Sequence, residues 1–140
     1  MTAEALFSIA NTVALLSWLG LIALPRVRWV TTVVTGWLVP ALLAVAYVVL
    51  LAANWGGPGG FSTLGGVAQL FGNPWVLLAG WIHYLTFDLL VGTWESRDAR
   101  ERGVPHLALI PCLLLTFLFG PAGWLLYRAV RRVATRTAVA

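Results

Sequence analysis

Long apolar runs alternate with short polar connections along this chain. A helix needs about 20 apolar residues, each rising about 1.5 Å, to cross a bilayer. The pattern therefore predicts an all-α fold, an integral membrane bundle of four transmembrane helices forming one membrane domain over residues 1–140. The expected spans are residues 3–24, 29–53, 74–94 and 105–127, followed by a basic tail at 128–140.

A glycine-rich stretch separates the second expected span from the third. Residues 54–74 hold seven glycines, which is unfavourable for a regular span. Apolar residues recur at helical spacing from Phe61 to Phe71, so a short interfacial helix is expected within a surface loop.

Gly120-Pro121 interrupts the last apolar run. Proline removes a backbone hydrogen bond, and glycine favours helix ends. Two outcomes stay open for the residues that follow. They complete the span to Tyr127, or they lie along the interface as a basic helix.

Composition assigns the chain to the membrane. It is 60% hydrophobic and 10% charged, whereas a soluble domain has about 25% charged residues. All nine cationic residues are arginines in the connections and the tail, which is typical of membrane flanks and argues against nucleic acid as a partner. With four spans, five arginines lie on one side and four on the other, so charge hardly decides the orientation.

Features outside the spans add little. The lone Cys112 has no partner for an internal disulfide and is expected to be a packing residue. The chain begins almost directly with its first span, without a basic leader. We therefore expect a prokaryotic-type protein of the cytoplasmic membrane.

The third expected span is the one that carries ionisable side chains. His83 and Asp88 lie inside it, and Glu95 follows its end. An ionisable residue within a span is costly to desolvate and marks a candidate functional site.

Helical spacing sorts these residues into two groups. Asp88 and Glu95 are seven residues apart and about 20° apart around a helix. Their stripe also contains Trp81, Tyr84 and Gly92. His83 lies about 140° from Asp88 and aligns instead with Phe87. His83 and Asp88 are therefore not expected to share one small pocket.

Asp88 and His83 each have a structural and a functional interpretation. Asp88 either is held by a polar neighbour such as Asn11, or transfers protons in an apolar pocket. His83 is either a hydrogen-bonded structural residue or a catalytic one.

A metal site built from His83, Asp88, Glu95, Asp98 and His106 has no supporting motif spacing, so no metal and no other cofactor is expected. The charged run after Trp94 indicates a solvated helical extension, with an Asp98–Arg102 pair.

At these residues the chain resembles the abscisic-acid-deficient-four-like family, small membrane proteins akin to plant neoxanthin synthase. The resemblance rests on three segments in the C-terminal half: HYLTFDLLVGTW, RDARERGVPH and PCLLLTFLFGPAGWLLY. It implies a four-helix membrane protein that acts on or binds a carotenoid or related isoprenoid. Plant members are associated with converting violaxanthin, an epoxide, into neoxanthin, an allene, by an isomerisation.

The resemblance implies roles for the residues of the third span. Asp88 is expected to be the first proton-transfer group, with His83 and Glu95 next. The expected substrate-binding residues are Tyr84, Trp81, Phe87, Gly92 and Asn11, with Tyr84 holding the epoxide or hydroxyl oxygen.

Other classes of function stay open. One is a non-catalytic membrane protein that binds a pigment or lipid, or an accessory subunit of a partner enzyme. Another is a small carrier. The expected partners are membrane lipid and an apolar isoprenoid, and assembly with a second copy or a partner enzyme stays open.

Overall fold

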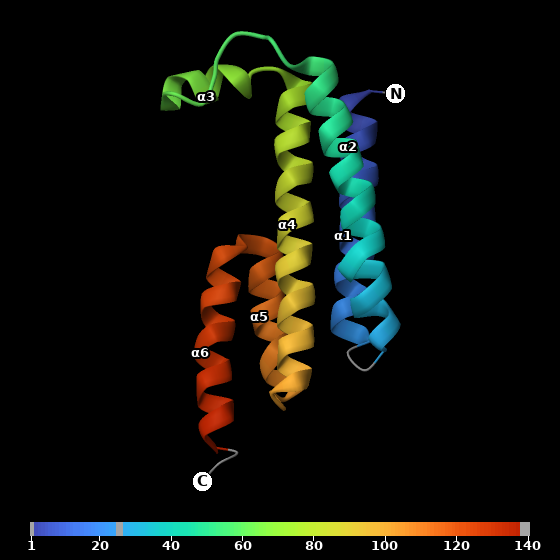
Figure 1. Ribbon diagram of the computed structural model, residues 1–140, viewed down its shortest axis with the longest axis vertical. Helices are drawn as coiled ribbons and strands as arrows, with labels where there is room; N and C mark the ends of the chain where they lie inside the picture. The colour runs from blue at the N-terminus through green and yellow to red at the C-terminus, as the bar shows by residue number, and fades with distance from the viewer. Residues whose placement is uncertain (1, 25–26, 138–140) are drawn as a thin grey trace.

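The computed structural model describes residues 2–24 and 27–137, and within them the fold is all-helical (Figure 1). Pro25 and Arg26, which follow the first expected span, lie outside the described residues, as do residues 1 and 138–140. The helices are α1 (Ala3–Ala23), the π-helix η1 (Val30–Leu38), α2 (Val39–Asn54), α3 (Leu64–Leu70), α4 (Pro74–Glu101), α5 (His106–Phe119) and α6 (Pro121–Thr137).

In the described part of the chain, three helices are long and apolar enough to cross a membrane. They are α1, the continuous segment Val30–Asn54 formed by η1 and α2, and α4. They match the first three expected spans, and the chain is a helical membrane protein. The short helix α3 lies within the glycine-rich stretch, at the end of the molecule where α4 begins (Figure 1).

The second span begins as the π-helix η1, whose hydrogen bonds reach one residue further back than those of an α-helix. Pro40 follows it near the start of α2 and has no amide hydrogen to donate to the turn before it. The wide turns are visible in the bond from the Val39 amide to the Val34 carbonyl, five residues back. The Thr35 hydroxyl also donates to the Val30 carbonyl at 3.1 Å.

The central element is α4, which packs against α1, α2, α5 and α6. It continues to Glu101, past the expected end at residue 94. The expected Asp98–Arg102 pair is confirmed, with Nε and Oδ1 2.9 Å apart. The expectation that this extension is solvated holds for Arg97 and Glu101, which are exposed, and is wrong for two acids: Glu95 is 0% exposed and Asp98 is 8% exposed, because α5 and α6 cover them.

The fourth expected span, residues 105–127, is not one helix. α5 ends at Phe119, and α6 begins at Pro121 and runs back beside α5 (Figure 1). Gly120 has φ +43°, in the region that L residues rarely adopt, and Pro121 is favourable as the first residue of a new helix. With 14 residues, α5 is about 21 Å long, less than the roughly 30 Å of a hydrocarbon core. The residues after Gly120 therefore do not continue α5 to Tyr127 as one helix.

The return of α6 gathers the arginines at one end. The expected basic tail is helical as far as Thr137, and Arg131 on α6 contacts Asp98 near the end of α4. Arg100 of α4 donates to Thr31, in the first turn of η1, at 2.9 Å. The arginine-bearing end therefore contains the start of η1, the end of α4 and the C-terminal part of α6.

Candidate functional site

The α5–α6 hairpin meets α4 at Asp88, midway along the longest helix. A Cβ added to Gly120 would lie 2.7 Å from Asp88 Oδ1. Both its positive φ and this close approach favour glycine at the tip of the hairpin. Gly120 immediately precedes α6, so the partial positive charge at the start of that helix is near the carboxyl group.

Asp88 has an unsatisfied oxygen. The residue is 9% exposed, and its Oδ2 atom is buried without a hydrogen-bond partner. Most buried polar atoms in proteins have a partner. The hydroxyl of Tyr84 lies beside the carboxyl group. The arrangement therefore leaves an acceptor, or a place for a proton, inside the bundle.

Tyr84 ties α4 to the end of α5. Its hydroxyl lies 3.3 Å from the carbonyl oxygens of both Phe117 and Leu118, to which it donates. The last carbonyls of a helix have no partner within that helix. The tyrosine therefore satisfies backbone groups that the break at Gly120 leaves open.

An apolar groove runs along α1 and α4 toward this point. One cavity of about 310 Å³ is lined by residues that include Asn11, Leu15, Trp81, Tyr84, Phe117 and Leu118. A second cavity of about 270 Å³ is lined by residues that include Ala3, Phe7, Pro74, Leu77 and Trp81. Trp81 borders both, so we call them together the α1–α4 groove.

Trp81 is held where the two cavities meet. Its indole Nε1 donates to Asn11 Oδ1 at 2.9 Å. Its ring lies 5.7 Å from the ring of Phe7 and 5.3 Å from that of Tyr84, between centroids. Asn11 therefore binds Trp81, and the structure has no hydrogen bond between Asn11 and Asp88 among the described residues.

Glu95 shares the stripe with Asp88 but is fully enclosed. The Thr116 hydroxyl of α5 lies 3.0 Å from Oε1 and 3.1 Å from Oε2, and donates to the carboxylate. Glu95 does not line the α1–α4 groove. Its contacts fix α5 to α4 and give it no direct access to a ligand there.

His83 and Phe87 lie on a different side of α4. The His83 ring is 5.4 Å from the ring of Tyr47 on α2 and 4.6 Å from that of Phe87. Phe87 is 55% exposed. As the spacing predicted, His83 is not brought together with Asp88, and neither His83 nor Phe87 lines the groove.

Gly92 serves close packing between helices. A Cβ at this position would lie 2.3 Å from Cη2 of Trp18. Trp18 on α1 is 1% exposed and its ring is 5.4 Å from that of Phe117. The glycine therefore admits the indole against α4, and it does not line the groove.

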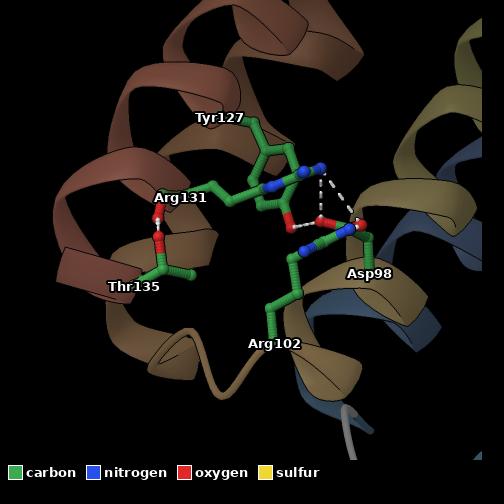
Figure 2. A network of polar contacts seen from close by, with 5 residues as sticks. All are labelled: Asp98, Arg102, Tyr127, Arg131 and Thr135. Atoms are coloured by element: carbon green, nitrogen blue, oxygen red, sulfur yellow. Dashed lines mark hydrogen bonds and ion pairs between the residues drawn. The ribbon is translucent and has the colours of Figure 1, made fainter. Parts of the chain in front are cut away.

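A polar cluster around Asp98, not found by sequence reasoning, joins α6 to the end of α4 (Figure 2). The Tyr127 hydroxyl donates to Oδ2 at 2.5 Å, and Nη1 of Arg131 lies 3.1 Å from the same oxygen. Arg102 completes the cluster, and its hydrogen bond to Asp98 raises the pKa of the guanidinium. Helical spacing predicted only its Asp98–Arg102 pair, because Tyr127 was assigned to a continuing fourth span.

Metal ligands do not gather in the described part of the chain. Within residues 2–24 and 27–137, no three His, Cys, Asp or Glu side chains are grouped so that they could hold an ion. His106, one of the five residues considered, instead has Nε2 2.8 Å from the Ile22 carbonyl oxygen.

These features define a helical membrane protein in which a half-length hairpin meets a buried carboxyl group on a full-length span. The chain matches the family described as ABA DEFICIENT 4-like over residues 5–127, and it belongs to that family. The match confirms the resemblance drawn from the three C-terminal segments. No curated protein and no solved structure matches the chain.

Proposed function

We propose that the protein binds a carotenoid or related isoprenoid in the α1–α4 groove and isomerises it, with Asp88 transferring the protons. The observation that carries the proposal is the buried, unpartnered Oδ2 of Asp88 beside Tyr84, a residue that lines the apolar groove. Membership of the family supports the substrate class.

The groove suits an elongated apolar ligand. From Ala3 to Leu15 it follows about 18 Å of α1. The rings of Phe7, Trp81 and Tyr84 offer flat surfaces against which a polyene would pack. A ligand lying in the groove would bring one end group near the hairpin tip.

One carboxyl group suffices for an isomerisation of the epoxide-to-allene type. Protonated Asp88 donates its proton to the epoxide oxygen as a carbon–oxygen bond breaks. The carboxylate then takes a proton from the neighbouring polyene carbon, and the C–H electron pair forms the new double bond. Atoms and electrons balance, and Asp88 returns to its starting state. Tyr84 would hold the oxygen, whereas His83 and Glu95 lie away from the groove.

The test compares pigments from a carotenoid-producing host that expresses the protein. We expect Asp88→Asn to abolish conversion, lowering it at least 100-fold, while bound pigment is retained. Glu101→Gln makes the same acid-to-amide change at an exposed position of the same helix and is the matched control. Conversion by Asp88→Asn at the wild-type level, in folded protein, would contradict the catalytic role.

A non-catalytic pigment-binding protein is the second candidate. It is favoured by one observation: Asp88 itself does not line the cavity that Tyr84 lines. In that case the wild-type protein would carry pigment without converting it. Trp81→Ala should lower the bound pigment several-fold under either function, so bound and converted pigment must be measured separately.

A further inference from the structure

The arginines of α6 lie at defined depths relative to the hairpin tip. The tip contacts Asp88 midway along α4, which places Gly120 near the middle of the bilayer. Along α6, Arg128 is about 10 Å and Arg132 about 16 Å from Pro121. Half of a hydrocarbon core is about 15 Å thick. Arg128 is therefore at the edge of the hydrocarbon, and Arg132 is level with the headgroups.

The acids nearby are already engaged or distant from these two arginines. The Asp98 carboxylate accepts hydrogen bonds from Arg131 and Arg102, and the charge of Glu101 interacts with the Arg102 guanidinium. Arg128 lies over the ring of Trp124, 5.6 Å from its centroid. Arg128 and Arg132 share one face of α6, four residues apart, and neither makes an ion pair within the described residues.

We propose that Arg128 and Arg132 bind the phosphate group of an anionic phospholipid in the leaflet at the arginine-bearing end. A guanidinium at the hydrocarbon edge needs a counter-ion, and its planar fork matches phosphate oxygens. Trp124 is an indole of the kind that anchors at this depth. Leu125 is 62% exposed beside it and offers an apolar surface to an acyl chain. The proposal does not depend on the proposed isomerase activity.

The experiment measures lipid retained by the purified full-length protein. Detergent-solubilised protein is mixed with phosphatidylglycerol or with phosphatidylcholine, and bound lipid is counted by native mass spectrometry. We expect the wild type to prefer phosphatidylglycerol and the double variant Arg128→Gln, Arg132→Gln to retain it several-fold less. Arg97→Gln removes one exposed arginine from the end of α4 and is expected to behave as the wild type.

The proposal would be overturned by equal retention of the two lipids or by full retention in the double variant. An equal loss in Arg97→Gln would overturn it too, because that loss would indicate an effect of overall charge. Displacement by millimolar inorganic phosphate would identify a free-phosphate site and also overturn it. If the double variant does not fold, Arg132→Gln alone gives the same comparison, because its side chain is exposed. The double variant Arg128→Lys, Arg132→Lys should recover part of the lipid retention.

Discussion

Asp88 and Glu95 lie on one stripe of α4 in different surroundings. Asp88 has a buried oxygen without a partner, next to the hairpin tip. Glu95 has both oxygens within reach of the Thr116 hydroxyl. Two buried carboxyl groups on one stripe therefore differ: one has an oxygen without a partner, and the other is held by a hydroxyl of the neighbouring helix.

Thr116→Val should destabilise the protein without changing its shape. The two side chains are nearly isosteric, but valine leaves the buried Glu95 carboxylate without its donor, at a cost of about 1–3 kcal/mol. We expect a lower midpoint of thermal unfolding in detergent. Thr12→Val is the matched control, because the Thr12 hydroxyl donates to a backbone carbonyl at an exposed position of α1. An equal effect in both variants would contradict the role of Thr116.

Gly123→Ala should disrupt the contact between α5 and α6. A Cβ at Gly123 would lie 2.1 Å from both the amide nitrogen and the hydroxyl oxygen of Thr116. Overpacking of this kind costs about 1–3 kcal/mol, and more where backbone must move. Unfolding midpoints compared with Gly65→Ala, where an added Cβ meets nothing within 4 Å, measure the effect. A stable Gly123→Ala variant would show that the hairpin packs differently.

At the scale of single residues, the sequence predicted which face of a helix a side chain lies on better than which residue it contacts. Helical spacing put Tyr84 and Asp88 on one stripe and His83 on another, as the structure has them. It could not show that Asn11 binds Trp81, or that Gly92 receives Trp18. Those contacts depend on how α1 crosses α4, and hydropathy carries no information about that crossing.

At the scale of elements, the first three spans follow from apolar length alone. The expected starts of all three match to within a residue, and the ends of the first two do as well, whereas α4 continues to Glu101. Apolar length alone does not predict the α5–α6 hairpin. Both of its helices are apolar near the tip, so the two apolar stretches together are as long as one span. The positive φ of Gly120 accompanies a reversal of the chain direction instead of a kink. The sequence does not show which backbone angle a glycine adopts.

Tyr127→Phe should loosen α6 from α4. The phenol donates to the Asp98 carboxylate inside the bundle, and hydrogen bonds to charged groups contribute about 1.5–3 kcal/mol. We expect faster cleavage by protease near the end of α6, together with a lower unfolding midpoint. Tyr47→Phe is the control, since the Tyr47 ring stacks on His83. Unchanged cleavage would mean that Arg131 alone holds the helix.

At the scale of the whole molecule, the returning hairpin changes the charge count that left the orientation open. The arginines at the end of α4 and on α6 lie at the same end as the start of η1, whereas the loop carrying α3 has no charged residue. Positive residues favour the cytoplasmic side. We therefore expect the arginine-bearing end to face the cytoplasm.

Single cysteines in a Cys112→Ser background test this topology. Cysteines replacing Glu101 and Arg132 should be labelled from the cytoplasmic side, and a cysteine replacing Ser62 from the opposite side. A continuous fourth span predicts instead that positions 101 and 132 react from opposite sides. Labelling of intact spheroplasts and of inverted vesicles with an impermeant maleimide separates the two arrangements.

The half-length hairpin also gives the protein unequal cross-sections in the two leaflets. In the described part of the chain, α5 and α6 lie beside α4 only along its half nearer the arginine-bearing end, whereas α1 and the segment of η1 and α2 run along both halves (Figure 1). Such a molecule is a wedge. It expands one leaflet relative to the other, so at high density it favours a membrane that is convex on the arginine side, and it should enrich in regions that already have this curvature.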